Sequence, residues 1–120
     1  MITLTTLDTA TAQQVFDQVK NHLLKQNARS ENESVGCAYK QGDLKCAAGC
    51  LISDNEYKSD YEGLSWEWLV VLHNISSNHK NLIRELQLIH DKEDVEGWED
   101  SLRHLAEMFD LEWNNSTSNK

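Results

Sequence analysis

The sequence predicts a mainly α-helical domain of the α+β kind, with about four helices packed together and one short β-hairpin. Three observations support this prediction. Apolar residues recur at spacings of three and four in four separate stretches, which is the pattern of amphipathic helices. A cysteine-rich segment between the first two stretches has a shorter period around a Gln-Gly pair, which indicates a hairpin. The 120 residues match the usual size of one domain, and the absence of proline suits a compact helical fold.

The first helix is expected over residues 12–26, where apolar side chains recur on one face. Thr11 and Gln14 have the spacing of a capping box, in which each side chain bonds the other residue's backbone N–H at the start of a helix. Residues 27–36 are polar and rich in turn-forming residues. We therefore expect a surface loop after the first helix.

The cysteine-rich segment is expected to form a hairpin that turns at Gln41-Gly42. A two-residue turn at that point makes Cys37 and Cys46 direct cross-strand neighbours, with Cβ atoms about 4.5–5.5 Å apart. Residues 53–63 carry four acids and one lysine, which indicates an exposed acidic connector.

Three more apolar stripes predict the remaining helices. They are Leu64, Trp68, Val71, Leu72 and Ile75, then Leu82, Ile83, Leu86, Ile89 and His90, and finally Val95, Trp98, Leu102, Leu105 and Phe109. These stripes are expected to pack around Phe16, Trp68, Leu86 and Trp98. Residues 1–112 should therefore form one globular domain, followed by a disordered tail over residues 113–120.

The charge is unevenly distributed along the chain. Residues 1–50 hold five acids and five bases, so the formal net charge of −9 comes entirely from residues 51–120. An acidic protein lacks the Lys/Arg clusters that bind nucleic-acid phosphates or an anionic membrane, so neither is an expected direct partner. No segment has the character of a secretory signal or a membrane span, which predicts a cytoplasmic protein whose three cysteines are reduced.

The acidic C-terminal half allows two interpretations. Residues 91–112 contain nine acids and two bases, and such a helix face is either a solvated surface or a site for a basic protein surface, in which the acids imitate nucleic-acid phosphates. Trp66 and Trp113 lie beside or beyond the apolar stripes. They either belong to the same partner surface or are covered by a neighbouring loop or chain end. The candidate binding residues are Trp66, Glu96, Glu99, Asp100, Glu107, Asp110 and Trp113.

The cysteines allow four interpretations. Cys37, Cys46 and Cys50 are either thiols packed as small hydrophobic residues, part of a reversible thiol switch, or ligands of a zinc ion with His90 as the fourth. Their spacing lacks the paired Cys-x2-Cys of common structural zinc sites, and no cofactor is predicted. The fourth interpretation is a nucleophilic cysteine with His90 as base and Asp91 orienting it, and its alternative is a buried, hydrogen-bonded core histidine.

The cysteine segment resembles small uncharacterised proteins of bacteria and their phages. The resemblance implies a bacterial, phage or prophage setting and no established activity. It extends more weakly to the first helix and to the stretch around Leu86 to Asp91. The turn between the two halves of the motif is shorter here than in many members. The residues that carry the resemblance are Cys37-x-Tyr39-Lys40, the run from Lys45 to Asp54, Tyr57, and Glu62-Gly63.

The combined observations favour a non-enzymatic, acidic protein-binding module. The family setting suggests a phage- or prophage-encoded inhibitor or regulator that acts on a basic protein surface. The alternative function is a small cysteine-centred enzyme or a zinc-stabilised domain that uses Cys37, Cys46, Cys50 and His90. The heptad-like stripe in the last helix also permits self-association.

Overall fold

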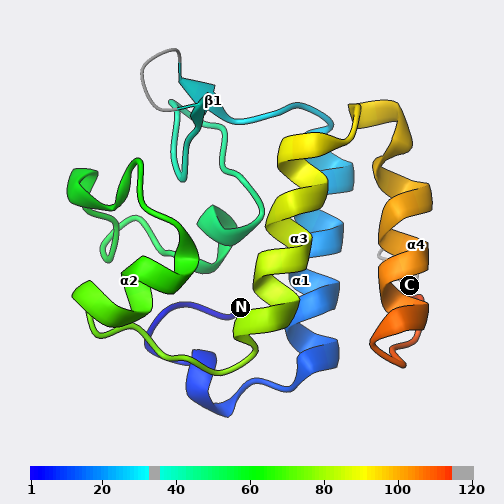
Figure 1. The fold of residues 1–120 in the computed structure, drawn as a ribbon, viewed down its shortest axis with the longest axis horizontal. Coiled ribbons are helices and arrows are strands. Elements are labelled where there is room, and N and C mark those ends of the chain that lie inside the picture. Colours follow the sequence, from blue (N-terminus) through cyan, green and yellow to red (C-terminus); the bar gives the residue numbers. More distant parts are fainter. Residues whose placement is uncertain (33–35, 115–120) are drawn as a thin grey trace.

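A computed structural model describes residues 1–32 and 36–114 and confirms the mainly α-helical prediction. In Figure 1, α4 lies on one side of α3, and α2 with the cysteine segment lies on the other, while α1 packs against both α3 and α4. Within the described ranges, no helix is long and apolar enough to span a membrane. The helices are α1 (Ala12–Gln26), α2 (Trp66–Leu72), α3 (Lys80–Lys92) and α4 (Trp98–Met108).

The first helix begins and ends at local signals in the sequence. Thr11 accepts a hydrogen bond from the backbone N–H of Gln14, and the Gln14 side chain accepts one from the Thr11 N–H, so the predicted capping box is present. The helix ends where Asn27 adopts a left-handed conformation with φ of 53°. The bounds of α1 are those predicted from the sequence.

The two long C-terminal helices bury the predicted stripes. All five stripe residues of α3 are buried, including His90. In α4 the central stripe residues Trp98, Leu102 and Leu105 are buried. Val95 lies in a short 3-10 helix before α4 and Phe109 just after it, and both are half-buried.

The predicted face of α2 is wrong. The side chain of Trp66 is only 4 % exposed and Leu69 is buried, whereas Trp68 is 56 % exposed and Val71 and Leu72 are exposed too. The helix has seven residues and carries apolar side chains on both faces, so its periodicity does not identify the buried one. Packing against α3 selects the Trp66 face, which also removes Trp66 from the predicted partner surface.

The two strands lie earlier in the chain than predicted. β1 (Glu31–Asn32) and β2 (Gly36–Cys37) pair antiparallel, and all of these residues except Cys37 fall in residues 27–36, which were expected to be a loop. Cys37 is therefore opposite Glu31, and the predicted cross-strand pairing of Cys37 with Cys46 is wrong.

At the predicted hairpin, a single antiparallel bridge joins Gln41 and Leu44. Gly42 has a φ of 63°. A tight hairpin turn needs a positive φ at its first central position, and glycine adopts this conformation most readily. The turn is therefore centred on Gly42-Asp43, one residue later than predicted. After Leu44 the chain enters a 3-10 helix, Ala48–Leu51, so the bridge does not extend into a ladder.

The C-terminal segment packs on the helices as far as it is described. The Trp113 ring meets the Phe16 ring edge-on, with centroids 6.2 Å apart. Lys20 Nζ lies 4.7 Å from the Trp113 ring centroid, and Arg103 Cζ lies 4.2 Å from it. Trp113 therefore belongs to the globule and not to the predicted tail; residues 115–120 of that tail lie outside the described residues.

Candidate functional site

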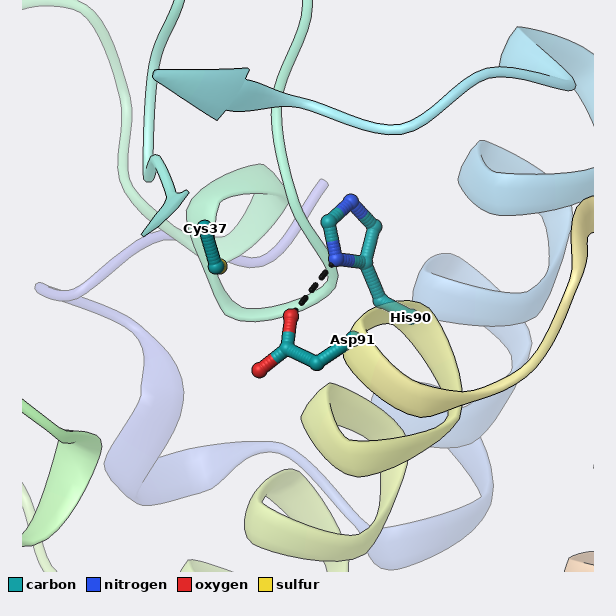
Figure 2. A group of neighbouring side chains, drawn as sticks. All are labelled: Cys37, His90 and Asp91. Atoms are coloured by element: carbon teal, nitrogen blue, oxygen red, sulfur yellow. Dashed lines mark hydrogen bonds and ion pairs between the residues drawn. The ribbon is translucent and has the colours of Figure 1, made fainter. Parts of the chain in front are cut away.

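Three chemistry-bearing side chains meet where β2 approaches the C-terminal end of α3. The ligand-type atoms of Cys37, His90 and Asp91 all lie within 4.8 Å of one another. Figure 2 shows Cys37 and Asp91 side by side, with the Asp91 carboxylate bonded to the His90 ring. Cys46 lies close enough to Cys37 to raise the pKa of its thiol, so two of the three predicted cysteines lie near His90 and Asp91. We call Cys37, His90 and Asp91 the thiol–imidazole cluster.

The remaining cysteine, Cys50, lies apart from the cluster. Its thiol donates to the backbone oxygen of Ala47 at 3.1 Å. Burial raises the pKa of Cys50 to about 12, so it is an un-ionised thiol at neutral pH. Cys50 is therefore not placed to share a metal ion with the cluster.

The His90 ring is held on all sides. It is fully buried and stacks on Trp98, with ring centroids 5.5 Å apart. Nδ1 lies 2.8 Å from Asp91 Oδ1, and Nε2 accepts the backbone N–H of buried Ser30 at 3.0 Å. A peptide nitrogen always carries its hydrogen, so Nε2 must act as the acceptor, and Nδ1 must carry the hydrogen that it shares with the carboxylate.

This arrangement decides what His90 can do chemically. A zinc ligand and a general base both need a free imidazole lone pair. Burial and the Ser30 N–H at Nε2 favour the neutral ring, whereas the Asp91 carboxylate favours the charged one. Protonation at Nε2 would break the Ser30 bond. In neither protonation state is a lone pair free, so the geometry favours the structural role over the ligand and base roles.

His90 organises the cysteine segment through Ser30. The Ser30 hydroxyl donates to the backbone oxygens of Ala38 at 2.8 Å and Leu44 at 3.3 Å. The imidazole therefore fixes a serine that in turn holds both sides of the turn at Gly42-Asp43. The sequence contained no signal for Ser30, because its contacts come from distant parts of the chain.

Cys37 is a weak nucleophile in this environment. Its pKa lies well above the usual range, first because of the hydrogen bond with Cys46 and then because of burial, although His90 acts in the opposite direction. Burial raises the pKa of Asp91, but hydrogen bonds with His90, Cys37 and Gln87 outweigh burial and lower it. Cys37 is therefore a neutral thiol beside a carboxylate, and both thiolate attack and rapid oxidation are disfavoured.

Gln87 is a site residue that the sequence analysis missed. Its Nε2 donates to Cys37 Sγ and to Asp91 Oδ1, and its Oε1 accepts the Ala48 N–H at 2.9 Å. Gln87 precedes Asp91 by four residues, so the two share one face of α3. That spacing is visible in the sequence.

The predicted acidic residues Glu96, Glu99, Asp100, Glu107 and Asp110 are all exposed. The spacing of Glu99, Asp100 and Glu107 places them on one side of α4, together with Arg103, which is paired with Glu99 at 3.1 Å.

One of these acids, Asp100, lines a groove of about 490 Å³ between α3 and α4. Leu88 is 40 % exposed and Met108 63 % exposed, so both are accessible at the groove. Within residues 1–32 and 36–114, Asp100 and Glu93 lie beyond 4.0 Å of every Lys or Arg nitrogen. The groove is lined by Glu85, Leu88, Ile89, Lys92, Glu93, Asp100, Ser101, His104, Leu105 and Met108.

Comparison with protein-family models, with curated proteins and with solved structures gives no match to this chain. The groove and the thiol–imidazole cluster are therefore interpreted from their own geometry and chemistry.

Proposed function

We propose that the protein is a non-enzymatic binding module that holds a basic amphipathic helix of another protein in the groove between α3 and α4. One observation carries the proposal: apolar side chains that are open to solvent line the same groove as two acids, Glu93 and Asp100, that have no Lys or Arg partner among the described residues. A groove of this kind suits a helix with apolar side chains on one face and Lys or Arg on the other.

The apolar part of the groove provides the attraction. Leu88 on α3 and Met108 on α4 are exposed, and the buried side chains of Ile89 and Leu105 line the groove with them. Each Å² of apolar surface that a bound helix removes from water contributes about 25 cal/mol of favourable free energy. Methionine adapts its shape to different neighbours, which suits a surface that accepts a partner side chain.

The charges select the occupant. Glu85, Glu93 and Asp100 line the groove against Lys92, and the whole chain has a net charge of −9. This field attracts a basic segment and speeds its encounter. The same field repels a second copy of this chain, so we favour a different, basic partner over self-association.

The family setting suggests where such a partner is found. The cysteine segment resembles bacterial and phage proteins, so we propose an inhibitor or regulator that acts on a basic protein surface in a bacterial host. In this proposal the thiol–imidazole cluster and Cys46 support the fold and carry out no reaction.

A labelled peptide tests the proposal directly. The probe is a fluorescein-labelled helix of about five turns, with leucine on one face and lysine on the other. We expect binding by fluorescence anisotropy that weakens from low to moderate salt, because the charged contacts are exposed. Binding that is independent of salt would contradict the charge argument.

Matched variants locate the peptide. Asp100→Lys should weaken binding about three- to tenfold, whereas Asp60→Lys makes the same charge change at an exposed site away from the groove and should have a much smaller effect. Met108→Ser should also weaken binding, and Val71→Ser removes an exposed apolar side chain from α2 as its control. Equal effects of each variant and its control would refute the groove as the binding site.

A further inference from the structure

One side of α2 exposes a cluster of large apolar side chains. Trp68 is 56 % exposed, Val71 70 % and Leu72 59 %, and their spacing places all three on the same side of the helix. In Figure 1, α2 lies on the opposite side of α3 from α4, so this cluster is separate from the groove between α3 and α4. We call Trp68, Val71 and Leu72 the outer face of α2.

The sequence of α2 is unusual for a helix at the surface of a monomer. Glu67 is the one polar residue among its seven, and the other six are apolar. A helix that is apolar all round is normally buried all round, whereas a surface helix has a polar outer side. Packing on the rest of the chain buries Trp66 and Leu69 but leaves the outer face open. Exposed apolar patches of this kind mark interaction sites.

The charged groups beside the outer face suit a second copy of the same surface. Glu67 precedes Val71 by four residues and therefore lies on the same side of α2. Its carboxylate is 3.8 Å from Arg84 on α3, and the Glu67 and Arg84 side chains are 50 % and 47 % exposed. Arg84 also contacts Glu85 at 3.6 Å. A two-fold axis brings the same patch of two copies face to face, so the glutamate of each copy meets the arginine of the other.

The size of the outer face sets the strength of such a contact. Three large side chains that are each more than half exposed present on the order of 300 Å² of apolar surface, and two copies together bury about twice that area. With the surrounding rim, the interface stays below about 1,200 Å², which is the size of a weak, reversible contact. Each chain also has a net charge of −9, which opposes association at long range.

We propose that the outer face of α2 is the contact surface of a two-fold homodimer, in which the outer faces of two copies pack together and Glu67 of each copy meets Arg84 of the other. None of these contact residues lines the groove between α3 and α4, so the dimer leaves that groove open. The apolar stripe of α4 is not used, because its central residues are buried within the chain.

Sedimentation equilibrium of the full chain tests the dimer directly. We expect a Kd of about 50–500 μM in about 0.15 M salt, and a severalfold lower Kd in about 0.5 M salt, which screens the repulsion between two acidic chains. This salt response is opposite to the one expected for the basic peptide in the groove. A chain that stays monomeric up to about 1 mM at both salt concentrations overturns the proposal. A monomeric chain that instead co-sediments with phosphatidylcholine vesicles assigns the face to a lipid surface and also overturns it.

Apolar substitutions locate the contact. Val71→Ser should raise the Kd of the dimer about tenfold, because a small part of an interface carries most of its energy. Met108→Ser removes an exposed apolar side chain from the groove and should leave the Kd of the dimer unchanged. The groove peptide should show the reverse pattern with the same two variants. Equal effects of Val71→Ser and Met108→Ser on the dimer refute the outer face as its contact surface.

Two charge reversals test the two-fold arrangement. Glu67→Arg and Arg84→Glu each place like charges opposite one another, so each variant alone should associate at least about threefold more weakly than the wild type. In an equal mixture, both cross-chain pairs are again opposite in charge, and the Kd should return towards that of the wild type. Glu107→Arg makes the same change of net charge at an exposed site on α4, and it should not restore association when mixed with Arg84→Glu. Circular dichroism checks that each variant is folded, and a mixture that associates no better than its components refutes the contact between Glu67 and Arg84.

Discussion

Replacing His90 with phenylalanine tests whether the ring is held as a structural acceptor. The His90→Phe side chain has one more ring atom than the imidazole and keeps an aromatic ring against Trp98, whose ring centroid lies 5.5 Å away. It removes both nitrogens. The backbone N–H of Ser30, a fully buried residue, then loses its acceptor, and Asp91 loses one donor.

The expected cost is set mainly by Ser30. A buried donor without a partner costs about 1–3 kcal/mol. Asp91 adds less, because its side chain is 28 % exposed and water can replace the lost donor. We therefore expect His90→Phe to lower the free energy of unfolding by about 2–3 kcal/mol, which corresponds to a fall in Tm of roughly 8–12 °C for a domain of this size.

Urea unfolding followed by circular dichroism measures this difference. His104→Phe makes the same chemical change at an exposed position on α4 and should change the free energy of unfolding by less than about 0.5 kcal/mol. If His90→Phe is as stable as the wild type, the hydrogen bond from Ser30 to His90 does not contribute to the free energy of unfolding. The lone-pair argument against His90 as a zinc ligand or base then fails.

Three further predictions concern separate parts of the structure. Trp66→Ala should lower the free energy of unfolding by about 3–5 kcal/mol and Trp68→Ala by less than about 1 kcal/mol, because the first side chain is 4 % exposed and the second 56 %; equal losses in urea unfolding would refute the assigned face of α2. Gly49→Ala should cost about 2 kcal/mol or more, because its Cβ would lie 2.1 Å from the Tyr39 backbone oxygen. Burial raises the pKa of Glu56, but hydrogen bonds from neighbouring hydroxyl and backbone groups outweigh burial and lower it from 4.5 to about 2. This carboxylate therefore adds stability above pH 4.5 that is lost as the pH falls towards 2, and Glu56→Gln should lack that part of the acid sensitivity.

Two controls belong to these tests. Gly97→Ala places its Cβ 3.9 Å from the nearest side-chain atom, so it should be tolerated where Gly49→Ala is not. Asp60→Asn removes an exposed carboxylate that has no side-chain hydrogen bond or ion pair with any residue that the structure describes, so it should leave the acid unfolding curve unchanged. Identical acid unfolding of the wild type and Glu56→Gln would show that the Glu56 hydrogen bonds contribute nothing.

The candidate sites were predictable where one helix supplies the residues. His90 and Asp91 are adjacent, and Gln87 shares their face of α3, so this part follows from sequence spacing. The approach of Cys37 and the bond from Ser30 depend on how the chain before β2 crosses α3. The groove between α3 and α4 is assembled from two separate helices, so no single stretch of sequence describes it.

The sequence by itself determined the fold class and the three long helices. The capping box of α1 and the stripes of α3 and α4 are patterns of residues close together in the sequence. These helices can therefore be predicted without knowledge of the tertiary contacts. Only the tertiary structure decided which face of α2 is buried, where the turn near Gly42 falls, and that Trp113 packs onto the globule. In each of these three cases the local preferences are nearly balanced, and burial against distant parts of the chain selects one arrangement.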